Sequence, residues 1–170
     1  GSMSLADAVK LVNLRGKLMQ NAVPQGEGAM AAILGLADDK VVELCQSVSA
    51  SGQGSVEAAN YNSQGQVVIA GSTASVQQVM ALAKEQSAKA IALPVSVPSH
   101  CSLMKPAAEK FAEALEQTAI ELPTIPVIQN VNAGIATDVA QLRQALTAQL
   151  YQSVQWTRTM QSLQDQGIQY

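Results

Sequence analysis

One histidine and two cysteines are the residues of this chain best suited to chemistry at neutral pH. His100 is the single histidine among 170 residues, so a general base working near neutral pH is predicted to be this residue. Pro94 and Pro98 precede it and predict a stiff segment that ends in an accessible loop. A purely structural histidine is the alternative, and the sequence leaves both interpretations open.

The sequence offers no convincing nucleophile for such a base. Cys101 follows His100 directly, but neighbours on an extended segment seldom point the same way, so a Cys–His pair is not favoured. The chain contains no G-x-S-x-G, P-loop or G-x-G-x-x-G sequence, so a serine elbow and nucleotide chemistry have no support. With one histidine and only Cys45 and Cys101 as thiols, we expect no metal site.

Several polar residues could complete a site around His100. Arg15 lies on or beside an apolar stripe, where an arginine either extends to water or holds a carboxylate by paired hydrogen bonds. Gln149 falls late in a predicted helix, where its backbone carbonyl is free to accept a hydrogen bond. Asn60 and Asn62 could line a polar site, although turn formation is the simpler interpretation of each alone.

Composition excludes several classes of protein. Thirteen acidic and ten basic residues give a net charge of −3, which argues against a dedicated nucleic-acid binder. Apolar runs such as AMAAILGLA are far shorter than the roughly 20 residues that span a bilayer, so no membrane association is expected. The chain shows no secretory signal, and two cysteines are too few for a disulfide framework. These features predict a cytoplasmic location.

Apolar periodicity and turn residues predict a mixed α/β (α+β) protein. A first helix, capped by Ser4 or Asp7, is expected to run to about Asn21. The following segments are predicted as strand 29–34, helix 38–49, strand 56–61, turn 62–65, strand 66–71, helix 72–86 and strand 90–95. This β-α-β-β-α-β order is the ferredoxin-like pattern. The remaining segments are predicted as helix 104–116, a strand-like run 123–131, a turn at 132–134 and helices 138–150 and 156–166.

Several stretches carry a specific resemblance, namely LADAVKLVNLRGKLMQNAVP, GAMAAILGL, NYNSQGQVVIAG, PSHCSLMKPAA, IPVIQNVNA and QLYQSVQWTRTMQSL. In order and spacing they resemble the malonyl-CoA:acyl carrier protein transacylases of bacterial type II fatty acid synthesis. That resemblance implies an α/β-hydrolase-like acyltransferase subdomain with a ferredoxin-like subdomain inserted in it. The division would place residues 1–24 in the large subdomain, 25–97 in the small one and 98–170 in the remainder of the large one.

The resemblance also implies a mechanism and a set of site residues. In this family a serine attacks the malonyl thioester, and the acyl group then passes to the phosphopantetheine thiol of the carrier protein. His100 matches the base, Arg15 the clamp for the malonyl carboxylate, and Gln149 the residue whose carbonyl orients the histidine. The positions that match the pocket are Met19, Asn60, Asn62 and Ser99. The implied substrates are malonyl-CoA and acyl carrier protein, with no separate cofactor.

The chain departs from the family pattern at both ends. It has neither the G-H-S-x-G nucleophile nor the G-P-G-x-V-L segment, so we expect an internal fragment that is inactive alone. Apolar faces that lose their cover are then expected to be exposed or buried elsewhere, which would favour a homo-oligomer. They include Leu11, Leu14, Leu18, Phe111 and Trp156. The alternative is a non-catalytic ferredoxin-like module that binds a partner or assembles with itself.

Overall fold

The computed structural model describes residues 1–52, 54–95 and 97–168, and every structural statement below refers to these residues. Gln53, Ser96, Gln169 and Tyr170 lie outside the described residues, as does the part of the extended stretch between Pro94 and Pro98 that falls on Ser96. The first half contains α1 (Leu5–Gln20), β1 (Gly28–Leu34), α2 (Asp38–Ala50), β2 (Val56–Ser63), β3 (Gln66–Ser72), α3 (Thr73–Glu85) and β4 (Lys89–Ala92). The second half contains the 3-10 turn η1 (Ser102–Met104), α4 (Lys105–Glu116), α5 (Val139–Ala148) and α6 (Trp156–Asp165).

The four strands form one antiparallel sheet in the order β2-β3-β1-β4. The predicted β-α-β-β-α-β order and the mixed fold class are confirmed. The turn between β2 and β3 is shorter than predicted, because Asn62 and Ser63 still belong to β2. Only Gln64 and Gly65 make the turn, and Gly65 takes a φ of 73°, which glycine adopts without steric cost.

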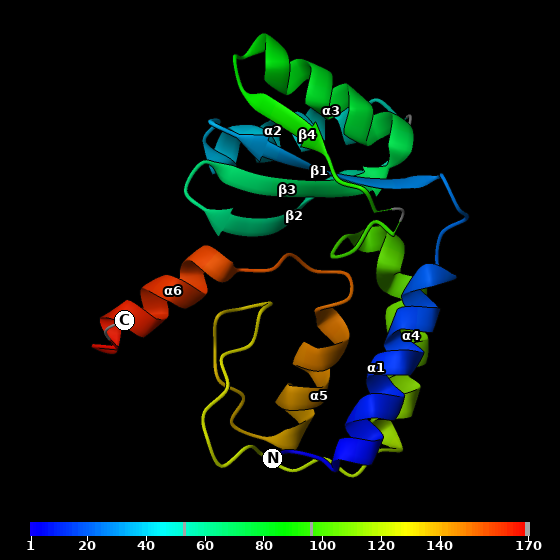
Figure 1. Ribbon diagram of the computed structural model, residues 1–170, viewed down its shortest axis with the longest axis vertical. Helices are drawn as coiled ribbons and strands as arrows, with labels where there is room; N and C mark the ends of the chain where they lie inside the picture. Colours follow the sequence, from blue (N-terminus) through cyan, green and yellow to red (C-terminus); the bar gives the residue numbers. More distant parts are fainter. Residues whose placement is uncertain (53, 96, 169–170) are drawn as a thin grey trace.

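Helices α2 and α3 cover one face of this sheet (Figure 1). Ile33 and Ile69 point from the strands into a core that the helices close with Val41, Cys45 and Val79. The helical spacing of Val41 and Cys45 and the short apolar runs of β1 and β3 made this layer predictable.

The opposite face of the sheet looks toward α1, α4, α5 and α6 (Figure 1). Here α1 packs on α4, and α4 packs on α5, around a second core. Of the residues expected to lose their cover, Leu11 and Phe111 are buried in this core, whereas Trp156 is 47% exposed. Leu14 and Leu18 are half-buried. Ser4 accepts a hydrogen bond from the Asp7 backbone and so caps α1, one of the two caps predicted.

Two predicted strands differ from the observed structure. Strand β4 ends at Ala92 rather than residue 95, since Pro94 has no N–H to continue the ladder. The strand-like run 123–131 forms no strand within the described residues, and only Ile128 makes an isolated bridge, to Ile135. A strand exists only when a neighbour supplies hydrogen-bond partners, and no described strand lies beside this run. The prediction of a strand was therefore wrong for this structure.

Candidate active site

The loop between β4 and α4 holds His100 in an unusual backbone conformation. Its φ is 64°, in the left-handed region that residues other than glycine seldom adopt. The His100 N–H donates a 3.0 Å hydrogen bond to the Leu150 carbonyl, which ties the loop to the segment after α5. Backbone strain of this kind persists only where surrounding contacts enforce it. The loop at His100 is therefore held by a contact with the segment after α5.

The imidazole of His100 has a defined orientation. Its Nδ1 lies 2.6 Å from the backbone carbonyl oxygen of Gln149, the residue that caps the C-terminal end of α5. A carbonyl oxygen can only accept, so Nδ1 carries the proton and Nε2 keeps its lone pair. The partial negative charge at a helix C-terminus also favours any positive charge that develops on the ring. This is the arrangement that a histidine needs to act as a base through Nε2.

Burial and charge together keep His100 neutral. Burial lowers the pKa of His100, hydrogen bonds with the backbone of Gln149 and Gln152 raise it, and the positive charge of Arg15 lowers it, with a net shift below the ordinary value. The pKa of His100 is thus sensitive to the positive charge that α1 carries at Arg15. A neutral imidazole at pH 7 is ready to accept a proton.

We expect His100 in the folded chain to titrate below the pKa of the same residue in the denatured chain. Between the folded-state and the denatured-state pKa, the unfolded chain binds more protons than the folded chain. The contribution of His100 to the free energy of unfolding is therefore complete above pH 7, and it decreases as the pH falls through about 6.5 toward the folded-state pKa. Proton NMR can measure this titration without ambiguity because the chain has one histidine. A folded-state pKa above the denatured value would contradict the assignment of burial as the dominant cause.

Arg15 carries a positive charge with no anionic partner among the described residues. It is half-buried on α1, and burial lowers its pKa. The ion pairs in the described part of the chain join Lys10 to Asp7 and Lys40 to Glu43. A partly desolvated guanidinium without a counter-ion is suited to bind an anionic group by two parallel hydrogen bonds.

The remaining predicted site residues differ in their burial and in the elements on which they lie. Ser99 precedes His100 and is half-buried. Asn60 is half-buried on β2 and bridges Val154, in the segment that follows Gln149. Asn62 lies two residues further along β2 and is also half-buried. Met19 is 5% exposed and belongs to the second core, so its side chain is packed inside the protein rather than on an open surface.

Cys101 does not form a pair with His100. Its side chain is fully buried against the sheet, and its Sγ donates to the Pro98 carbonyl at 3.2 Å. Burial raises the pKa of both Cys101 and Cys45 to about 12, so neither thiol is a ready nucleophile. Among the described residues no cluster of three or more His, Cys, Asp or Glu side chains could hold a metal ion.

Sequence reasoning did not identify Glu57 or Ser102 as part of this region. The Glu57 carboxylate on β2 accepts hydrogen bonds from the N–H and the hydroxyl of Ser102, two residues after His100. The available signal was an acidic residue between Val56 and Ala58, both of which are buried in the first core. An acid in such a strand needs a partner, but the sequence does not say which one.

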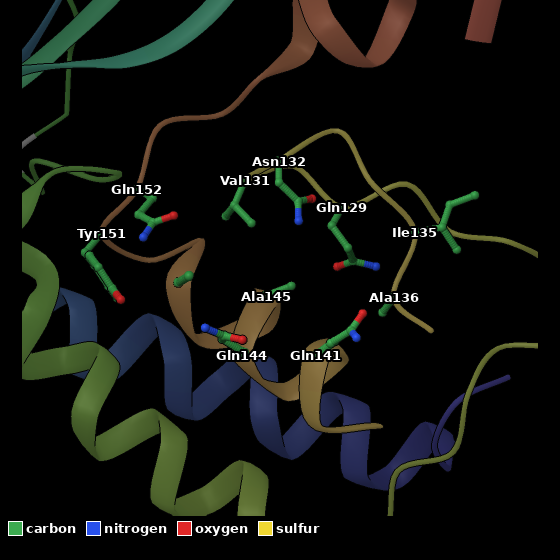
Figure 2. A pocket seen from close by; sticks show the side chains of 11 residues that line it. Gln129, Val131, Asn132, Ile135, Ala136, Gln141, Gln144, Ala145, Tyr151 and Gln152 are labelled. Atoms are coloured by element: carbon green, nitrogen blue, oxygen red, sulfur yellow. The ribbon is translucent and has the colours of Figure 1, made fainter. Parts of the chain in front are cut away.

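A cavity of about 320 Å³ lies beside this region, between α5 and the 128–136 segment (Figure 2). Gln141 and Gln144 face it from α5, and Gln129 and Asn132 face it from the opposite segment. Gln152, three residues after Gln149, closes one end. None of the predicted site residues lines this cavity.

In the described part of the chain, no helix combines the length and apolar character needed to cross a bilayer.

Comparison with known proteins gives a consistent result. Residues 1–168 match the family model described as "Acyl transferase domain". The chain is 49% identical over 171 residues to the malonyl CoA-acyl carrier protein transacylase of Salmonella typhimurium, covering 100% of this chain and 55% of that protein. A solved structure of FabD from Acinetobacter baumannii is 99% identical with a TM-score of 0.99, and the match covers 100% of this chain and 54% of that one.

A further solved structure holds a malonyl-transacylase in complex with the acyl-carrier protein of a type II polyketide synthase. It is 44% identical to this chain with a TM-score of 0.95, over 99% of this chain and 54% of that one. The chain thus spans about half the length of the relatives that it matches. Because the family model extends over nearly all of the sequence, the chain belongs to the acyl transferase domain family.

Proposed function

We propose that this chain supplies the general base and the carboxylate clamp of a malonyl-CoA:acyl carrier protein transacylase. His100 removes the proton from a serine hydroxyl through Nε2, and the hydroxyl oxygen then attacks the thioester carbon of malonyl-CoA. The CoA thiolate leaves and takes the proton back from His100. The same steps in reverse order pass the malonyl group to the phosphopantetheine thiol of the acyl carrier protein.

The observation that carries this proposal is the oriented imidazole of His100. Nδ1 donates to Gln149 at 2.6 Å, which leaves Nε2 as the base, and the positive charge of Arg15 lowers the pKa of the same ring. A malonyl group has a thioester carbon to be attacked and a free carboxylate to be held. The base and the unpaired guanidinium match these two ends of one substrate.

We assign smaller parts to the other predicted residues. Ser99 and Asn60 lie on segments next to the histidine loop and the segment after Gln149, and they would flank the acyl group. Asn62 would extend this polar edge along β2, and Met19 would support Arg15 from below on α1. The division into residues 1–24, 25–97 and 98–170 is also proposed, supported by the separate cores of the two faces.

The partners follow from the same proposal. The structure of a homologous malonyl-transacylase with an acyl-carrier protein supports an acyl carrier protein as acceptor. The chemistry uses malonyl-CoA and the carrier's phosphopantetheine as substrates and needs no separate cofactor. Two buried free cysteines, Cys45 and Cys101, support a reducing compartment such as the cytoplasm.

The direct test is a transfer assay on the pure chain. We expect no malonylation of holo acyl carrier protein above the uncatalysed rate, because the sequence contains no G-H-S-x-G nucleophile. Intact-mass spectrometry of the carrier protein measures the product. The matched control is the longer Acinetobacter baumannii FabD protein under the same conditions, which should malonylate the carrier. Transfer by the short chain would show that another residue acts as the nucleophile.

A second candidate function, self-assembly, is favoured by an exposed apolar stripe on α1. Leu5, Val9 and Val12 recur at helical spacing and are 81%, 60% and 69% exposed. We expect the chain to form a dimer or larger species in light scattering, because pairing two such stripes removes them from water. Val9→Glu should shift the chain toward monomer, whereas Lys17→Glu, at an exposed position of the same helix that lies off this stripe, should not. A monodisperse monomer in the unsubstituted chain would contradict this.

A further inference from the structure

We propose that Glu57 is a positioning residue for His100 and acts through Ser102. This inference rests on the proposed role of His100 as the base. Glu57 belongs to β2 in the small sheet, whereas His100 lies in the loop after β4 and Ser102 begins η1, just before α4. The Glu57 carboxylate would therefore hold the His100 loop in a fixed position relative to the sheet, and so restrict the imidazole.

The contact joins one carboxylate oxygen to two donors of a single residue. Oε1 of Glu57 accepts from the Ser102 N–H at 3.2 Å and from the Ser102 hydroxyl. Hydrogen bonds to a carboxylate are stronger and more directional than those between neutral groups. Two of them to one residue fix both its position and its rotation. Ser102 is separated from His100 by Cys101 alone, so little freedom remains between them.

Cys101 prevents the loop from pivoting about this contact. Its side chain is fully buried in a cluster that Met30, Ala32, Val68 and Ala70 form on the sheet. The loop is thus attached to the sheet at Cys101 by packing and at Ser102 by hydrogen bonds. His100 must take its left-handed backbone conformation between this attachment and the Leu150 carbonyl.

The next residues of β2 position the acceptor of the imidazole. The Ser153 hydroxyl donates to the Ala58 carbonyl at 2.6 Å, and the Val154 N–H donates to the Ala59 carbonyl at 2.8 Å. These contacts hold the segment that follows Gln149, whose carbonyl accepts the hydrogen bond from Nδ1. Glu57 fixes the loop that carries the donor, and residues 58 and 59 fix the segment that carries the acceptor.

This arrangement explains how a 2.6 Å hydrogen bond is kept between two segments that are 49 residues apart. Both segments are hydrogen-bonded to consecutive residues of β2, from Glu57 to Ala59. The pairing of β2 with β3 is irregular at this point, between Ala58 and Asn60. Loss of the Glu57 carboxylate would release the donor side alone. The Nδ1···O distance would then vary, and both neutral tautomers of His100 would be populated.

The test uses the isolated chain and the nitrogen NMR signals of its one histidine. In the unsubstituted chain at pH 7.5 we expect the Nδ1-protonated tautomer to dominate. Glu57→Ala should reduce the ratio of the Nδ1-protonated to the Nε2-protonated tautomer about tenfold, the size expected when a charge-assisted contact is lost. Glu57→Gln, which keeps one accepting oxygen, should restore part of the ratio. Glu85→Ala on α3 is the matched control and should leave it unchanged.

A purely structural role would give a different pattern. In that case denaturant unfolding would show lower stability while the folded population kept the original tautomer ratio, and the proposal would be wrong. If Glu57→Ala does not fold, Ser102→Ala replaces it, with an expected reduction of about threefold because one of two donors remains. An unchanged ratio in folded Ser102→Ala would then overturn the proposal. Neither measurement involves acyl transfer, so a failure of the proposed enzymatic function would be seen separately, in the transfer assay.

Discussion

Replacing His100 by glutamine, at the equivalent position of the longer Acinetobacter baumannii protein, is expected to lower kcat for malonyl transfer by about 10³–10⁴-fold. Glutamine has a similar size and can still donate a hydrogen bond to the Gln149 carbonyl. It cannot accept a proton near pH 7, so the serine hydroxyl would stay protonated and weakly nucleophilic. KM for malonyl-CoA should change much less, because Arg15 rather than His100 is proposed to hold the substrate. Steady-state kinetics with holo acyl carrier protein measures both constants.

The same variant should also fail to form the covalent intermediate. Intact-mass spectrometry after mixing with malonyl-CoA should show no malonyl adduct, whereas the unsubstituted protein should accumulate one. Gln144→Ala is a matched control, since that side chain is exposed on α5 near Gln149 without touching His100. Its kcat should remain within about twofold. If the glutamine variant kept its kcat, the base would have to be a group other than His100.

The small sheet and its two helices were predictable because each element carries its own signal. Val41 and Cys45 recur at helical spacing, and Ile33 and Ile69 lie in short apolar runs bounded by turn residues, so the type of each element could be predicted. The same reasoning failed for residues 123–131. Their apolar alternation shows that they could form a strand, but strand formation also depends on a neighbour that the pattern does not contain.

The candidate site was predictable only in part. The uniqueness of His100 and its place after two prolines pointed to it, and the position of Gln149 near a helix end pointed to a free carbonyl. Spacing left two interpretations of Arg15 open, and the structure gives the missing fact that this residue is half-buried and makes no ion pair with any described residue. The Glu57–Ser102 contact joins residues 45 positions apart. No local rule relates two such polar residues, so only the fold could show it.

Replacing Arg15 by alanine in the same longer protein is expected to lower kcat/KM for malonyl-CoA by about 10³-fold. Removing one partner of a buried, hydrogen-bonded charge pair costs about 2–5 kcal/mol, because the other charge is left without compensation. Acetyl-CoA lacks the free carboxylate, so its rate of transfer should change by less than about threefold. Competition between the two thioesters, followed by the mass of the carrier protein, measures this change in preference.

Arg15→Lys is the informative comparison, because it keeps the charge and removes the planar pair of donors. We expect kcat/KM for malonyl-CoA to fall by about 10²-fold in Arg15→Lys, a smaller loss than in Arg15→Ala. Stability should not fall in Arg15→Ala, since burial of the unpaired guanidinium already disfavours its charged form. A thermal unfolding midpoint at or above that of the unsubstituted protein would support this. Equal losses for malonyl-CoA and acetyl-CoA would instead show that Arg15 supports the site as a whole and does not recognise the carboxylate.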